Sequence, residues 1–87
     1  MITMHIPTAL RSYTAQQGNV QVEGATLADA LTALDRRYPG IRFRIVTEQD
    51  RIRPHIRIFV DEAQLQDLAA PLRRTDSVYI VCALSGG

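Results

Sequence analysis

Hydrophobic and polar residues alternate along several stretches of the chain, and this period of two is typical of half-buried β-strands. The first two stretches, residues 2–6 and 20–23, are separated by a polar segment, residues 12–19, in which a loop is expected. Because the two stretches lie close together in the sequence, they are predicted to form an antiparallel hairpin. Two more strands are predicted at residues 55–60 and 77–83.

An amphipathic helix is predicted between the hairpin and the later strands. Thr26 is a good N-cap residue, and Asp29, three positions later, suits the positive end of the helix dipole. Pro39 and Gly40 end the helical pattern. The apolar residues between these signals recur every three or four positions and form one stripe: Leu27, Ala30, Leu31, Leu34 and Tyr38.

The region after the helix is less regular. Residues 41–45 alternate isoleucine or phenylalanine with arginine, which favours a further strand, and residues 47–50 are expected to form a turn. The connection between the last two predicted strands is polar and contains Pro71, so no regular element is predicted there.

The order of these elements predicts an α+β fold. The last strand must bury Val78 and Ile80 against the apolar stripe of the helix, and the simplest place for it is beside the first strand. These two strands are then parallel neighbours, joined by a crossover through the helix. The result is a mixed sheet with one main helix packed across it, a β-grasp arrangement. We expect one domain, residues 1–84, followed by a flexible Ser-Gly-Gly tail, residues 85–87.

The strand period also predicts which side chains lie on the sheet face opposite the helix. An aromatic-centred patch on that face is expected to be a docking surface, because exposed apolar clusters often mark interfaces. The alternative is that single aromatic residues merely lie on the surface. Leu84, at the root of the tail, is expected to be a rim anchor. The side chains assigned to this face are Thr3, His5, His55, Arg57, Phe59, Tyr79 and Val81, and partner binding is assigned to Arg57, Phe59, Tyr79, Val81 and Leu84.

Cys82 is expected to point toward the helix as a small core residue. A metal site made of His5, His55 and Cys82 is not expected, because the strand period places the two histidines on the opposite face and the spacing is not that of zinc ligands. A thiol in apolar surroundings has a raised pKa and is inert, so Cys82 is not expected to be a nucleophile. No catalytic side chain is predicted, and the chain is not expected to be an enzyme.

Composition narrows the classes of function. Ten basic and nine acidic residues nearly cancel, which argues against nucleic-acid binding. No apolar run approaches the ~20 residues of a membrane-spanning helix, and no signal peptide is evident. With a single cysteine, a cytoplasmic protein is expected. All ten basic residues are arginines, so the sequence has no lysine.

The sequence closes with Gly86 and Gly87, which have no Cβ atom and can thread into a channel too narrow for side chains. A terminal carboxylate is a poor acyl donor until ATP converts it into an acyl adenylate, with Mg²⁺ offsetting the phosphate charge. The adenylate can then accept sulfur, giving a thiocarboxylate, or transfer to a thiol or an amine. This chemistry belongs to partner enzymes, so the chain itself is expected to bind no cofactor, and ATP and Mg²⁺ are used by the activating partner.

Three segments carry a resemblance to a known family. IPTALR at residues 6–11, HIRIFV at residues 55–60 and VYIVCALSGG at residues 78–87, in a β-grasp order, resemble the ubiquitin-like sulfur carriers, the group of ThiS, MoaD and CysO. IPTALR followed by a polar loop is most similar to the CysO-type branch. The resemblance implies adenylation of Gly87 by an enzyme of the ubiquitin-activating type, sulfur from a sulfurtransferase or a sulfide source, and delivery to a sulfur-accepting biosynthetic enzyme.

Three functions stay open at this point. The first is a sulfur carrier, for which the resemblance favours cysteine synthesis, while thiamin, molybdopterin, tRNA thiolation and specialised metabolites use the same chemistry. The second is a ubiquitin-like modifier conjugated through Gly87 to lysines of target proteins. The third is a non-catalytic interaction domain. The absence of lysine favours the carrier over a modifier that builds chains on itself.

Overall fold

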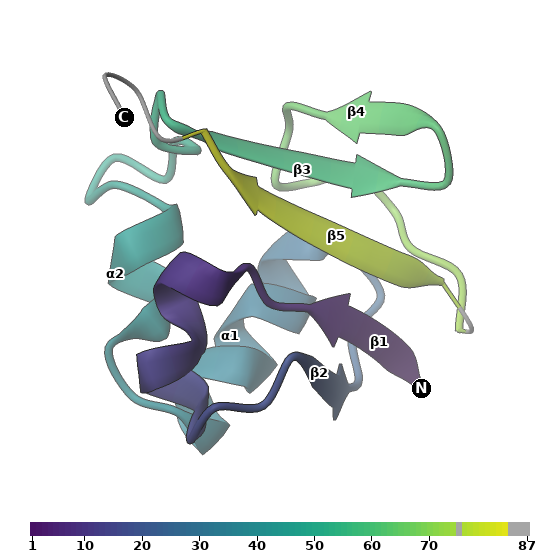
Figure 1. The fold of residues 1–87 in the computed structure, drawn as a ribbon. Helices are drawn as coiled ribbons and strands as arrows, with labels where there is room; N and C mark the ends of the chain where they lie inside the picture. The colour runs from purple at the N-terminus through teal and green to yellow at the C-terminus, as the bar shows by residue number, and fades with distance from the viewer. Residues whose placement is uncertain (75, 84–87) are drawn as a thin grey trace.

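The structure is a computed structural model and describes residues 1–74 and 76–83. A mixed sheet is crossed on one face by the helices (Figure 1). The elements, in chain order, are β1 (Ile2–His5), a 3₁₀ helix η1 (Thr8–Thr14), β2 (Asn19–Val22), α1 (Leu27–Arg37), α2 (Ile41–Ile45), β3 (Ile56–Val60), β4 (Ala63–Leu65) and β5 (Ser77–Cys82).

The sheet has the strand order β2-β1-β5-β3-β4. β1 pairs with β2 in antiparallel fashion and with β5 in parallel, whereas β3 is antiparallel to both β4 and β5. The predicted hairpin and the parallel pairing of the first and last strands are therefore confirmed. Figure 1 shows β5 running through the middle of the sheet, with α1 behind it. The fold is the expected β-grasp.

Helix α1 follows the sequence signals closely. The Thr26 side chain accepts a hydrogen bond from the Asp29 backbone N–H at 3.2 Å, as an N-cap should. Four members of the predicted stripe are buried, and Tyr38 packs against the core with part of its ring exposed. The stripe meets the inward residues of the strands, among them Val78 and Ile80 of β5, in one hydrophobic core.

The start of α1 is also tied to the connection that precedes β5. The backbone N–H groups of Leu27 and Ala28 donate to the carbonyl oxygens of Ala70 (3.0 Å) and Leu68 (2.8 Å). In the reverse direction, the Leu72 N–H donates to the Ala25 carbonyl at 2.8 Å. These bonds satisfy amides that a helix otherwise leaves without intrahelical partners.

The strand predicted at residues 41–45 is wrong, because this segment is the short helix α2. Ile41 and Ile45 are both fully buried, and their spacing of four residues places them on one helical face, while Phe43 points outward with 53% of its surface exposed. The Asp35 carboxylate accepts hydrogen bonds from the backbone N–H groups of Gly40 and Arg42, each at 3.1 Å. Asp35 therefore organises the turn into α2, aided by the positive φ of Gly40 (101°).

Two further elements differ from the prediction. The polar segment 12–19 was expected to be a loop, but its first residues belong to η1, in which Leu10 and Thr14 are buried. The Thr14 hydroxyl lies within hydrogen-bond distance of the carbonyl oxygens of Gln17 (2.7 Å) and Arg11 (3.3 Å), which allows a polar side chain to be buried there. The polar connection after β3 contains the short edge strand β4, which no pattern in the sequence indicates.

None of the helices within residues 1–74 and 76–83 is long and apolar enough to cross a membrane.

Candidate functional site

The sheet face opposite α1 carries the predicted aromatic patch. Tyr79 of β5 lies between His5 of β1 and Phe59 of β3 in the strand register, and Val81 lies opposite Arg57. Tyr79 and Val81 are 44% and 43% exposed, and Arg57 is exposed as well, whereas Phe59 and His5 are half-buried. The five side chains thus form one surface, called the open-face patch below.

An aromatic stack stiffens the centre of the patch. The rings of His5 and Tyr79 are stacked with 4.0 Å between their centroids and 5° between their planes. Such pairs contribute roughly 0.5–1.5 kcal/mol beyond the burial of their surface. The His5 Nε2 atom is buried and has no hydrogen-bond partner among the described residues. The stack therefore holds the Tyr79 ring in a fixed orientation. It also leaves the buried His5 Nε2 atom without a hydrogen bond, which is unfavourable.

Arg57 is held at one end of the patch. Its guanidinium donates to the backbone carbonyl of Pro54 and, at 3.2 Å, to that of Ile56. Because both acceptors lie at or just before the start of β3, the positive charge is fixed near the strand end that pairs with Cys82.

The last described residues of the chain are anchored beside β3. Cys82 pairs with Ile56, and the Ala83 backbone N–H donates to the His55 carbonyl at 2.7 Å. The last described residue, Ala83, therefore lies two residues after Val81 of the patch. Three predicted site residues, Leu84, Gly86 and Gly87, and the predicted tail at residues 85–87 lie outside the described residues.

Cys82 is half-buried, and burial raises the pKa of its thiol by desolvation. The predicted inward direction of the side chain and its protonated state are in line with this environment. A thiol held in this form at neutral pH is a weak nucleophile.

One part of the reasoning about Cys82 needs correction. The strand period was expected to keep both histidines away from it, but His55 and Cys82 line the same hollow of about 360 Å³, together with Tyr13, Arg44 and Arg53. His55 precedes the first residue of β3, so the strand period does not apply to it. His5 lies elsewhere, on the open-face patch, and residues 1–74 and 76–83 contain no group of three metal-ligating side chains.

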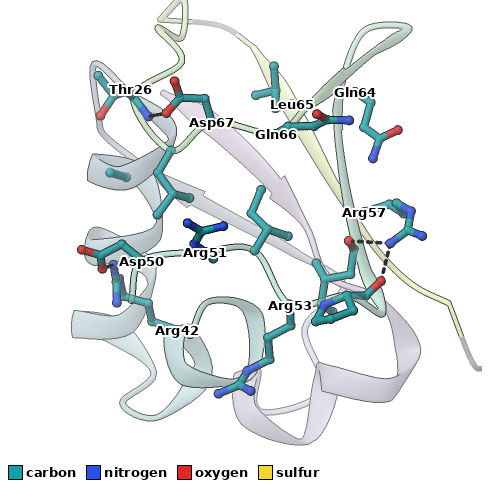
Figure 2. Close-up of a pocket in the computed structure, with 16 residues that line it drawn as sticks. Thr26, Arg42, Asp50, Arg51, Arg53, Arg57, Gln64, Leu65, Gln66 and Asp67 are labelled. Carbon is teal, nitrogen blue, oxygen red and sulfur yellow. Dashed lines mark hydrogen bonds and ion pairs between the residues drawn. The ribbon is translucent and has the colours of Figure 1, made fainter. Parts of the chain in front are cut away.

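A second, larger hollow was not predicted. It is a groove of about 1270 Å³ between the segment 50–57, the start of α1 and the segment 64–69 (Figure 2). Four arginines line it, Arg42, Arg51, Arg53 and Arg57. The repeated arginines of the sequence RIRPHIR, residues 51–57, were the available signal. The groove itself could not be recognised, because its opposite wall includes β4.

The comparisons with known proteins agree with this architecture. Residues 4–87 match the model of the ThiS family. The sulfur carrier protein CysO of Mycobacterium tuberculosis is 31% identical over 91 residues, which cover 99% of this chain and 98% of that protein.

Solved structures give the same result for the fold. The crystal structure of the Amycolatopsis orientalis BexX/CysO complex contains a chain that superposes with a TM-score of 0.92 at 29% identity, and the match covers both chains completely. SAMP1 from Haloferax volcanii superposes with a TM-score of 0.77 at 23% identity, covering 99% of this chain and 98% of that one, which shows a shared fold. The family match over nearly the whole chain, together with the CysO homology, places the protein by descent: it belongs to the ThiS family and is a homologue of CysO-type sulfur carriers.

Proposed function

We propose that the protein carries sulfur as a thiocarboxylate on Gly87. The observation that carries this proposal is the 31% identity to a sulfur carrier over essentially the full length of both chains. The family match extends to Gly87, so the diglycine lies within the related region. The absence of lysine from the sequence further favours a carrier over a modifier that extends itself.

The proposed chemistry takes place in partner enzymes. A carboxylate oxygen of Gly87 attacks the α-phosphorus of ATP, and pyrophosphate leaves with the electrons of the broken P–O bond. Hydrosulfide then attacks the carbonyl carbon of the acyl adenylate, AMP leaves, and a thiocarboxylate remains. No atom changes its oxidation state overall when sulfide is the donor. Mg²⁺ bound with ATP in the activating enzyme offsets the phosphate charge.

In this scheme the protein is a cosubstrate. Its contribution is a terminus that fits a narrow channel and a surface that partner enzymes recognise. The raised pKa of the Cys82 thiol supports a cosubstrate role, because the only cysteine of the sequence is then protonated at neutral pH and a weak nucleophile. The delivered sulfur is proposed to enter a cysteine-type biosynthesis, as the CysO homology favours.

The open-face patch is proposed as the docking surface for the activating enzyme and for the sulfur-accepting enzyme. Tyr79 and Val81 supply exposed apolar surface, and the Tyr79 ring is preordered by its stack on His5. Rigid aromatic side chains lose little conformational entropy on binding and are frequent anchors of interfaces. Because Val81 lies only a few residues before the diglycine in the sequence, an enzyme that binds the patch is proposed to bind the diglycine as well.

Intact-mass analysis of the protein isolated from its native host tests the proposal. The expected result is a C-terminal fragment in which one oxygen is replaced by sulfur. A variant with one alanine added after Gly87 is the matched control and should acquire no sulfur. Higher-mass conjugates without a thiocarboxylate would identify a protein modifier. If neither conjugates nor a thiocarboxylate are found, the protein is an interaction domain. Both outcomes contradict the proposal.

A further inference from the structure

The groove shown in Figure 2 shares only Arg57 with the open-face patch, and the proposed function gives the rest of it no role. One wall is the segment 50–57, which leads into β3, and the other is the segment 64–69, which contains the end of β4. Ile52, Leu65 and Leu68 contribute apolar side chains that pack against the core. The groove therefore combines an apolar base with polar walls.

The charge of the groove is unbalanced. Four arginines and two aspartates, Asp50 and Asp67, line it, which gives a net charge of +2, whereas the whole chain carries only +1. The positive charge of the protein is thus concentrated at this surface. A field of this kind attracts a partner of opposite charge and orients it as it approaches.

The four arginines differ in how far they are already engaged. Arg42 forms an ion pair with Asp50 at 3.1 Å, and Arg57 is tied to backbone carbonyls as described above. Arg53 donates to the Phe43 carbonyl at 2.7 Å and lies over the Phe43 ring, 4.6 Å from its centroid. The guanidinium of Arg51 makes no hydrogen bond or ion pair within residues 1–74 and 76–83. Arg51 is therefore the cation of the groove that is most available to a ligand.

The groove is continuous with the place where the tail begins. Arg53 lines both the groove and the smaller hollow that holds His55 and Cys82. The His55 carbonyl accepts the hydrogen bond from Ala83, the last described residue before the tail. A ligand that lies along the groove and passes Arg53 therefore comes near His55, to which Ala83 is bonded.

We propose that this groove binds an acidic, extended segment of the enzyme that adenylates the tail. The inference rests on the proposed function for the identity of the partner. Carboxylates of the segment pair with Arg51 and Arg53, and its apolar side chains cover Ile52, Leu65 and Leu68. Arginine suits this task because its planar guanidinium binds a carboxylate through two parallel hydrogen bonds.

The geometry favours an extended acidic segment over a single phosphate group. Figure 2 shows the side chains of Arg51, Arg53 and Arg57 pointing in three different directions, so they do not converge on one point. The first amides of α1, which could otherwise cradle a phosphate, are already bonded to the carbonyls of Ala70 and Leu68. Acidic side chains spaced along a peptide match such divergent cations better than one compact anion does.

The first test uses a short polyglutamate peptide as the probe, added to ¹⁵N-labelled protein while the arginine Nε–H resonances are recorded. Saturable shifts are expected at Arg51 and Arg53, and not at Arg36 or Arg74. They should weaken as salt rises, because the Debye length is about 10 Å at 0.1 M ionic strength. Equal shifts at all arginines, or none, would overturn the proposal. So would inorganic phosphate that binds the same two arginines as tightly as the peptide.

The second test measures the adenylating enzyme directly by pyrophosphate exchange at varied carrier concentration. Arg51→Glu is expected to raise the KM for the carrier about tenfold, because it places like charges together, and Arg51→Lys should restore most of the affinity. Arg74→Glu is the matched control: it changes the net charge equally but lies before the start of β5, at the opposite end of that strand from the tail.

The outcomes separate this inference from the proposed function. If the unaltered protein supports exchange and Arg51→Glu behaves like Arg74→Glu, the groove is not the binding site, while the carrier function stands. If the unaltered protein supports no exchange with its cognate enzyme, the carrier function fails, and the peptide titration alone decides whether the groove binds acidic segments. Thermal unfolding of each variant verifies that it is folded during the assay.

Discussion

Tyr79→Ala tests the open-face patch most directly. The substitution removes the most exposed aromatic ring of the sheet face, 44% accessible, and with it the partner on which His5 stacks. Loss of the stack costs roughly 0.5–1.5 kcal/mol of folding free energy. For a domain of this size each kcal/mol lowers Tm by about 4–8 °C, so the variant stays folded at room temperature.

The effect on docking is expected to be larger than the effect on stability. Buried aromatic anchors commonly lose about 2 kcal/mol or more of binding free energy on truncation to alanine. A loss of that size raises the KM of the activating enzyme for the carrier roughly 30-fold, since 1.4 kcal/mol corresponds to a factor of ten. The rate at saturating carrier should change little, because the ring lies on the sheet and not on the reacting carboxylate.

The assay is ATP–pyrophosphate exchange at varied carrier concentration, with thermal unfolding measured in parallel. Tyr38→Ala is the matched control, because Tyr38 is a half-buried tyrosine that packs on the core and lies outside the patch. It should lower Tm at least as much as Tyr79→Ala and leave KM unchanged. Tyr79→Phe should resemble the unaltered protein in both measurements. If Tyr79→Ala remains folded with an unchanged KM, the open face is not the docking surface.

Four other predictions concern stability and reactivity. Asp35→Ala removes the acceptor of two backbone N–H groups at the turn into α2 and should lower the free energy of unfolding by about 1–3 kcal/mol, with Asp35→Asn milder, as measured by urea denaturation. Thr26→Ala removes the N-cap of α1 and should lower the free energy of unfolding by about 1 kcal/mol in the same assay. A change within error would mean that the hydrogen bonds to the Leu68 and Ala70 carbonyls are sufficient to hold the start of the helix. His5→Phe keeps an aromatic ring against Tyr79 but removes the buried, unpaired Nε2, so Tm should rise; a fall would show that this nitrogen is satisfied in solution. Burial raises the pKa of the Cys82 thiol, so at neutral pH the native protein should react more slowly with iodoacetamide than the urea-unfolded chain, and equal rates would contradict this. For the same reason the free energy of unfolding should fall as the pH rises from the ordinary cysteine pKa through the raised one.

The sequence was most informative where an element is long and has one buried face. The stripe of α1 and its Thr26 cap agree with the structure almost residue by residue, because periodicity and capping are local properties. The alternation of Val78 and Ile80 with Tyr79 and Val81 likewise predicted both faces of β5. The open-face patch followed from the same rule, since neighbouring strands share one register.

Prediction was poorest where an element is short and depends on distant contacts. Ile41 and Ile45 lie four residues apart and suit a helix as well as a strand, and only the outward Phe43 distinguishes the two. The helix is favoured by the Asp35 carboxylate of α1, which accepts hydrogen bonds from the backbone of the turn into α2. Residues 63–65 form a strand only because they pair with β3. The arginine groove was missed for the same reason: its two walls come from segments 50–57 and 64–69, and only the folded hairpin shows that they face one another.

The central place of β5 has a consequence for how the protein is made. The hairpins β1–β2 and β3–β4 have no common edge in the sheet, and β5, the last strand along the chain, joins them. During synthesis, therefore, the sheet can close only after the final strand has left the ribosome, and the long sequence separation of the β1–β5 pairing makes this a late step. A chain cut short before β5 has two unjoined hairpins and lacks Tyr79 and Val81 of the open-face patch. Under the proposed function, the strand that completes the sheet is also the strand that carries the exposed apolar side chains of the docking surface, so docking requires the folded sheet.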